Sequence, residues 1–249
     1  MTPPTARRAT LDVSPHVAAA LGALAEMTGR AFELVDTIAA ATLRQLELAE
    51  PPHRATLAGI DSLTADLVER DADLVQGAGF VAAVGLFDDA QWWLEWFARD
   101  DGKVQRLLVQ TDPQGPGFYD YQNLPWYVVA RDTGHRHVTG PYVDYLCTED
   151  YTLTFTTPLT LHDRFVGVAG CDVRVNAAEE WLLPALRRAS SRLVVLNAHG
   201  RIVASNSGRH VCGDLVGEVD VAAAWAAPGS VPGLHRLDDL PLGVLELDR

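Results

Sequence analysis

The feature that most constrains the fold is one stretch, Phe118 to Val175, in which a helix signal precedes two strand signals. Pro125 suits the first turn of a short helix, because the N–H that proline lacks is not needed there. Alternating β-branched and aromatic residues run from Tyr151 to Pro158 and from Phe165 to Val175, which predicts two strands. The polar segment His162–Arg164 between them predicts a turn, so the two strands should form an antiparallel hairpin.

Aromatic and acidic side chains are concentrated in this stretch. Aromatic rings attract an organic cation by ~0.5–2 kcal/mol each, and a carboxylate adds a charge-assisted hydrogen bond to any N–H donor. Asp172, at the end of an otherwise apolar strand, is the first candidate for that carboxylate, and Asp144 is the second. Core packing is the alternative for all of the rings, and we expect it for Trp92 and Trp93.

The order and spacing of five motifs resemble the Cache family, and more closely the membrane-distal lobe of its double-Cache form, a PAS-like extracytoplasmic sensor. The motifs are Tyr119-Asp120, Pro125-Trp126-Tyr127, Gly140-Pro141-Tyr142-Val143-Asp144, Thr152 to Pro158, and Gly167-Val168-Ala169-Gly170-Cys171-Asp172. The resemblance implies an α+β fold of two PAS-like lobes, with antiparallel sheets flanked by a long N-terminal helix. It also implies a sensor that binds a small molecule and is not an enzyme. The implied fold would bring the predicted ligand-binding residues around one cavity: Trp96, Tyr119, Asp120, Tyr121, Trp126, Tyr127, Tyr142, Asp144 and Asp172.

The resemblance also bears on the ligand. Amino-acid-sensing members carry a Tyr, an Arg two residues before a Trp-Tyr pair, a later Tyr and a strand-terminal Asp. The chain has these at Tyr119, Trp126-Tyr127, Tyr142 and Asp172. In those members the Arg binds the ligand's α-carboxylate, but here Leu124 occupies its position. This departure favours the amine-sensing branch, whose ligands are polyamines, biogenic amines, choline or betaine. Arg131 or Arg136 could replace the missing arginine, so an amino acid or other small carboxylate remains an alternative.

Composition narrows the class of protein. A net charge of −13 argues against a nucleic-acid-binding surface. No apolar run is long enough to span a bilayer, and residues 1–16 lack the apolar segment of a secretory signal. We therefore expect a free-standing cytoplasmic form without membrane contact. Cys147, Cys171 and Cys212 are odd in number and lack CxxC spacing, which favours reduced, buried thiols.

The chain divides into three predicted segments: a long helix in 1–52, a ligand-binding lobe in 53–176 and a smaller second lobe in 177–249. Ser14 is a good N-cap for the long helix, and Pro51-Pro52 ends it. The other expected elements are a helix at 53–69, strands at 76–87, 91–99 and 104–111, a helix at 177–189, a hairpin at 192–205, a short helix at 221–226 and one or two strands at 234–247.

The sequence contains only weak signals for catalysis or metal binding. His135 and His137 lie in what reads as a solvated polar loop, without a patterned third ligand. We therefore predict no cofactor and no enzymatic activity. The alternative from another class is an enzyme for a small metabolite, with Asp172 or Asp120 and a histidine as acid–base pair. A third hypothesis is a pure oligomerisation module, which would have no pocket.

Two expectations concern partners. The long helix has more apolar positions than it needs to pack against one face of a lobe. This surplus predicts a homodimer along the helix. No kinase, cyclase or DNA-binding segment follows, so any output should come from a separate partner.

Overall fold

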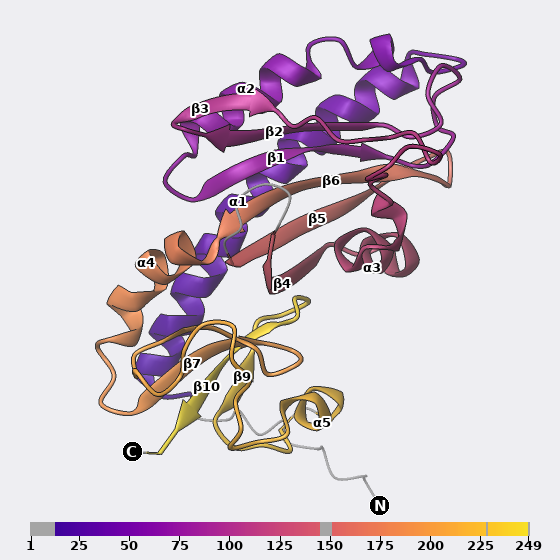
Figure 1. Cartoon of the computed structure of the whole chain (residues 1–249). Coiled ribbons are helices and arrows are strands. Elements are labelled where there is room, and N and C mark those ends of the chain that lie inside the picture. The colour runs from indigo at the N-terminus through magenta and orange to yellow at the C-terminus, as the bar shows by residue number, and fades with distance from the viewer. Residues whose placement is uncertain (1–12, 145–150, 228, 249) are drawn as a thin grey trace, which may run out of the picture.

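The computed structural model describes residues 13–144, 151–227 and 229–248. It has an α+β fold in which one long helix, α1 (Pro15–Glu47), runs along two antiparallel sheets (Figure 1). None of the described helices combines the length and hydropathy needed to cross a membrane.

The long helix begins as its sequence predicts. The Ser14 side chain accepts a hydrogen bond from the Val17 N–H at 3.2 Å, and Pro15 occupies the first helical position. The helix continues unbroken to Glu47, three residues short of the expected end. Its apolar side is buried against both sheets along the whole length. The fully buried apolar residues include Val17, Leu24, Met27, Val35 and Ile38.

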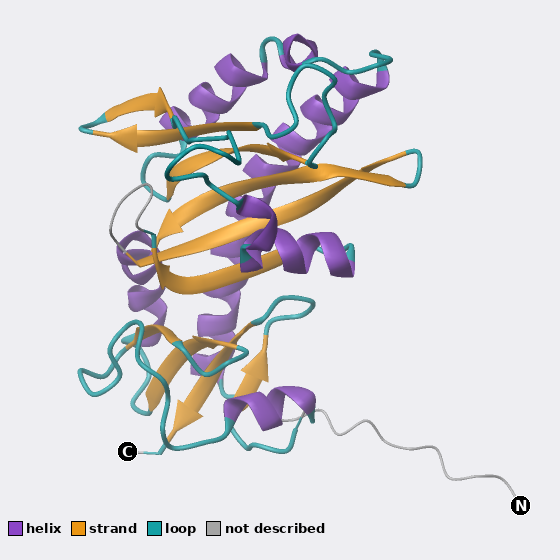
Figure 2. Cartoon of the chain, turned by 45° about the vertical axis from the view of Figure 1, so that its right-hand side comes forward, coloured by secondary structure: helices purple, strands orange, loops and turns teal. Residues whose placement is uncertain are grey.

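The first sheet has six strands in the order β3-β2-β1-β6-β5-β4. Their bounds are β1 (Val75–Ala82), β2 (Leu94–Asp100), β3 (Lys103–Arg106), β4 (His137–Val143), β5 (Tyr151–Leu161) and β6 (Arg164–Arg174). The predicted hairpin is β5–β6, turning at His162 and Asp163, both with positive φ. One face of the sheet packs on α1, and α3 (Pro125–Thr133) covers the other (Figure 2). The short helix η2 (Tyr121–Asn123) precedes α3.

Three local predictions for the first lobe are wrong. The expected helix at 53–69 is two pieces, η1 (Arg54–Leu57) and α2 (Ile60–Arg70), because Gly59 between them is in the left-handed region at φ +91°. The strands expected at 76–87, 91–99 and 104–111 are shorter. The segment of His137, expected as a loop, is strand β4 paired with β5.

The second sheet has four strands in the order β8-β7-β10-β9. Its elements are β7 (Arg192–Asn197), β8 (Ile202–Ser205), α5 (Val221–Ala226), β9 (Leu234–Arg236) and β10 (Leu242–Leu247). Helix α4 (Val175–Leu186) joins the sheets, and it ends two residues after Pro184. The two lobes also meet where the Asn197 side chain donates a hydrogen bond to the Gly140 carbonyl at 2.7 Å.

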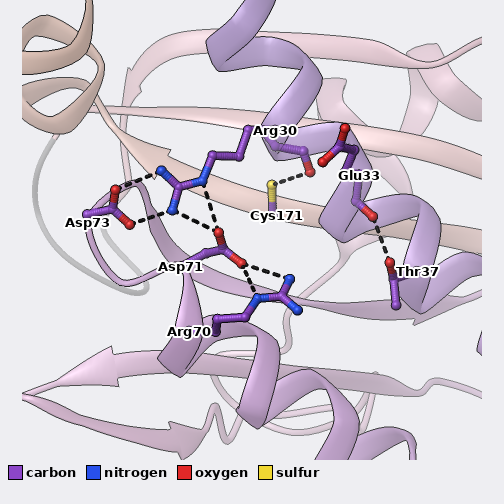
Figure 3. Close-up of polar contacts among 8 residues, drawn as sticks. Arg30, Glu33, Thr37, Arg70, Asp71, Asp73 and Cys171 are labelled. Atoms are coloured by element: carbon purple, nitrogen blue, oxygen red, sulfur yellow. Dashed lines mark hydrogen bonds and ion pairs between the residues drawn. The ribbon is translucent and has the colours of Figure 1, made fainter.

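A polar network fixes the middle of α1 to the first lobe (Figure 3). The Arg30 guanidinium donates to Asp71 Oδ1 at 2.9 and 3.0 Å and to both Asp73 oxygens at 2.7 Å. It also lies 5.5 Å from the ring centre of Trp181 on α4. Arg30 therefore joins α1, the start of β1 and the connecting helix.

Candidate functional site

A two-part cavity lies on the face of the first sheet that carries α3. The deeper part, the inner chamber, has a volume of about 30 Å³. Its lining residues are Val81, Leu94, Trp96, Leu107, Tyr119, Trp126, Tyr142, Asp144, Thr154 and Asp172. The wider part, the outer pocket, has a volume of about 420 Å³. Its lining residues are Tyr119, Leu124, Pro125, Trp126, Thr139, Tyr142, Val143 and Asp144.

Strand register builds the polar wall of the inner chamber. Thr154 on β5 is paired with Asp172 on β6, so both side chains project from the same face. The Thr154 hydroxyl donates to Asp172 Oδ1 at 2.6 Å. Tyr142 Oη lies 2.7 Å from Thr154 Oγ1. Because the single hydroxyl proton of Thr154 is directed to Asp172, Tyr142 must be the donor in that second bond.

The chamber is acidic, and its central carboxyl is buried. Asp172 is 6% exposed, and burial raises the pKa of its carboxyl to about 7, helped by the nearby charge of Asp144 and opposed by the Thr154 hydrogen bond. Burial, and then the charge of Asp172, raises the pKa of Tyr142. No Lys, Arg or His is among the described residues that line either part of the cavity. The charged residues among the described lining residues are therefore both acidic.

Glycines in β1 and β6 make room for the Trp96 ring. A Cβ on Gly77 would lie 2.9 Å from Trp96 Nε1, and one on Gly170 would lie 3.3 Å from the far edge of the same ring. Gly79, paired with both Trp96 and Gly170, has no space for a side chain, since its Cβ would lie 2.0 Å from the Glu95 carbonyl oxygen. Gly77 thus allows close packing against the Trp96 indole, and Gly79 allows close approach of the β2 backbone.

The structure brings six of the nine predicted residues together in the cavity walls: Trp96, Tyr119, Trp126, Tyr142, Asp144 and Asp172. The other three lie outside it. Tyr121 is fully buried, and its hydroxyl donates to the Ala82 carbonyl at 2.9 Å. Tyr127 packs into the core against Tyr121, with ring centres 5.4 Å apart. Asp120 accepts a hydrogen bond from the Asn123 side chain at 2.6 Å.

Local geometry explains why Tyr127 is not in the cavity wall. Consecutive residues on a helix point about 100° apart, so Trp126 faces the cavity while Tyr127 faces the core. Trp92 is a core residue, as expected, whereas Trp93 is half-buried between the guanidinium groups of Arg54 and Arg106. The sequence analysis did not single out Thr154, although strand alternation from Asp172 across the hairpin could have found it.

The two arginines considered as carboxylate partners are engaged elsewhere. Arg131 pairs with Asp132 at 2.7 Å. Arg136 pairs with Asp36 on α1 at 3.1 Å and lies over the Phe32 ring. Neither lines the inner chamber or the outer pocket.

The potential metal ligands of the described chain are ordinary ion pairs. The one group with suitable spacing, His53, Asp88 and Asp89, is exposed. His53 already pairs with Asp88 at 2.7 Å, and Asp89 pairs with Arg54 at 2.9 Å. Cys171 is a buried free thiol and Cys212 a half-buried one. Cys147 lies outside the described residues.

Comparisons with known proteins identify the fold. Residues 74–179 match the family model of the first PDC sensor domain of methyl-accepting-chemotaxis-protein-like proteins. Among curated proteins, none matches the chain.

Solved structures match over nearly the whole chain. The extracellular domain of the candidate histidine kinase mmHK1S-Z2 is 13% identical with a TM-score of 0.64, covering 95% of both chains. The ligand-binding domain of the Pseudomonas aeruginosa PAO1 amino-acid chemoreceptor PctC, in complex with GABA, is 21% identical with a TM-score of 0.55, covering 93% of this chain and 96% of that one. The ligand-binding domain of the Campylobacter jejuni chemoreceptor Tlp3, in complex with L-norvaline, is 10% identical with a TM-score of 0.58, covering 92% and 86%. The chain therefore has the fold of PDC (Cache) sensor domains.

Proposed function

We propose that this chain is a non-enzymatic sensor that binds a small organic cation, an amine or a quaternary ammonium compound, in its first lobe. One observation carries the proposal. Asp172, which is 6% exposed, lines an aromatic chamber in which none of the described lining residues supplies a positive charge. A buried carboxylate without a cationic partner is costly, and a bound cation would remove that cost while stacking on the rings of Trp126 and Tyr119.

The ligands named for two similar structures support one half of this chemistry. GABA and L-norvaline each carry an ammonium and a carboxylate. The acidic wall suits the ammonium, but Leu124 in the outer pocket offers nothing to a carboxylate. A sensor of an amino acid or another carboxylate is therefore the second candidate, less well supported because Arg131 and Arg136 are paired elsewhere.

An enzyme for a small metabolite has less support than a sensor. An acid–base pair needs a histidine beside Asp172, and none of the described lining residues is one. Signalling through a separate output partner and a dimer along α1 remain parts of this proposal, and sedimentation tests the dimer. A cytoplasmic location also stays a prediction, since one of the similar structures is an extracellular domain.

Titration calorimetry with choline, putrescine, phenethylamine, GABA, L-norvaline and propionate tests the proposal. We expect cations to bind and propionate not to bind. Asp172→Ala should weaken cation binding by about 2–4 kcal/mol, because it removes the buried partner of the ligand charge. Leu124→Arg should improve binding of L-norvaline and weaken binding of simple amines.

The matched control is Asp163→Asn, which removes one negative charge at the exposed β5–β6 turn, where Asn tolerates the positive φ. It should bind every ligand like the wild type. If propionate binds and the amines do not, or if Asp172→Ala binds amines unchanged, the cation-sensor proposal fails.

A further inference from the structure

We infer that the inner chamber selects a primary ammonium group and that the outer pocket takes an uncharged, apolar or aromatic tail. This inference rests on the proposed function and narrows it. Primary amines with a hydrophobic tail would be ligands, whereas quaternary ammonium compounds and amines with a carboxylate tail would not.

The first argument is enclosure. Val81, Leu94 and Trp96 line the inner chamber and are nearly fully buried, so the packed sheet resists moving them aside for a larger group. A primary ammonium brings one nitrogen and one bonded carbon to this place. A trimethylammonium group brings a nitrogen and four carbons.

The second argument is hydrogen bonding. The polar wall presents acceptors: the carboxylate of Asp172 and the hydroxyl oxygen of Tyr142. The Tyr142 proton is already directed to Thr154, and the Thr154 proton to Asp172. A primary ammonium brings three N–H donors to this wall. A quaternary ammonium has none, so it would desolvate the acceptors without replacing their hydrogen bonds.

The third argument concerns the tail. The outer pocket is lined by the rings of Tyr119 and Trp126 and by Leu124, Pro125 and Val143. Its one charged lining residue among those described is Asp144, at the boundary with the inner chamber. A carboxylate in the tail would meet no described cation there and would be repelled by Asp144. An alkyl or phenyl group would instead bury apolar surface.

A methylation series tests the inference on the wild-type protein. Calorimetry at pH 8 would compare phenethylamine, its N-methyl and N,N-dimethyl derivatives, the N,N,N-trimethyl cation and phenylalanine. We expect affinity to fall along the series and the trimethyl cation to bind about 100-fold more weakly than the primary amine, since charge-assisted hydrogen bonds are lost. Phenylalanine, which adds a carboxylate beside the same ammonium, should bind more weakly than phenethylamine.

The outcomes separate the two proposals. If the trimethyl cation binds as tightly as the primary amine, the chamber does not select primary ammonium groups and the inference is overturned, while the cation-sensor proposal stands. If phenylalanine binds as tightly as phenethylamine, the exclusion of ligands with a carboxylate is overturned. If no member of the series binds and the other cations do not bind either, both proposals fail.

Variants that enlarge one part of the cavity test which part is responsible for the selectivity between primary and quaternary ammonium groups. Leu94→Ala, or the milder Val81→Ala, should narrow the affinity ratio between primary and trimethyl ligands at least threefold, because both residues line the inner chamber alone. Leu124→Ala is the matched control, since Leu124 lines only the outer pocket. It should weaken the binding of both ligands and leave the ratio of their affinities unchanged. An unchanged ratio in folded Leu94→Ala and Val81→Ala proteins would contradict selection by the inner chamber.

Discussion

Asp172 is the residue at which burial, hydrogen bonding and neighbouring charge act together. Burial favours its neutral form, the Thr154 hydroxyl favours its charged form, and Asp144 disfavours the charge again. The result is a carboxyl whose pKa of about 7 lies well above the usual value for aspartic acid. A cation in the chamber would favour the ionised form, so ligand binding and proton release should be coupled.

This coupling predicts how affinity depends on pH. Only ionised Asp172 offers a full charge to an ammonium, so phenethylamine affinity should fall about tenfold for each pH unit below about 7 and level off above it. In Asp172→Asn the affinity should be low, and it should vary much less between pH 5 and pH 8. Calorimetry at several pH values in buffers of different ionisation enthalpy measures both the affinity and the proton release. Asp163→Asn is the control and should keep the wild-type profile; an equally steep profile in Asp172→Asn would assign the titration to a group other than Asp172.

The residue types of the site were easier to predict than their orientations. Asp172 and Tyr142 follow from chemistry: an acid that ends an apolar strand and a ring near a chain reversal. Tyr121 and Tyr127 carry the same ring chemistry, and nothing in the sequence alone separates them from Trp126. Only the rotation of η2 and α3 against the sheet decides that Tyr121 bonds to a strand carbonyl while Trp126 faces the cavity.

At the scale of elements, two kinds of glycine have opposite roles. Gly79 in β1 lies directly against the β2 backbone, and Gly170 in β6 lies under the Trp96 ring. Gly22 and Gly29 in α1 are exposed, and a Cβ at either would meet no atom within 4 Å. Packing requires the strand glycines, whereas nothing within the described chain requires the helical ones.

Alanine substitutions of a helical glycine and of a strand glycine should therefore change the free energy of unfolding in opposite directions. Gly22→Ala should raise the free energy of unfolding by about 1 kcal/mol, because alanine is the better helix former. Gly79→Ala should lower it by several kcal/mol, since its Cβ would overlap the Glu95 carbonyl. Urea denaturation measures both changes. If Gly22→Ala is destabilising, and more so at higher protein concentration, then the exposed face of α1 is an interface between two copies.

Most helices and strands could be predicted from hydrophobic periodicity and from helix caps. The predictions that were wrong have local causes. The long helix, the β5–β6 hairpin and α5 have uninterrupted patterns bounded by clear end signals. Strand β4 was missed because Gly140-Pro141 interrupts its alternation, and its pairing with β5 skips from Thr139 to Tyr142. The helix expected at 53–69 was wrong because a single glycine in the middle takes a positive φ.

At the scale of the whole molecule, α1 is the common support of both lobes. Its apolar residues pack on the first sheet, on α4 and on the second sheet, and are buried within one chain. The surplus of apolar positions that suggested a dimer is thus accounted for by the second lobe and the connecting helix. The dimer remains a prediction, and it would have to use the small and charged residues on the exposed side of α1.

Arg30 should contribute more to the stability of this arrangement than any ordinary surface ion pair. Its guanidinium binds Asp71, which is only 11% exposed, as well as Asp73, and lies over Trp181 of α4. Arg30→Gln should lower the free energy of unfolding by about 1–2 kcal/mol, because Asp71 loses one of its two charged partners while largely buried. Arg136→Gln is the matched control: it removes another α1 ion pair, with Asp36, whose side chains are 46% and 47% exposed, and should cost less than about 0.5 kcal/mol. Urea denaturation of the two variants at equal ionic strength measures both losses. Because Arg136 also lies over a ring, that of Phe32, equal losses would mean that the buried position of Asp71 adds nothing to the stability of the Arg30 network.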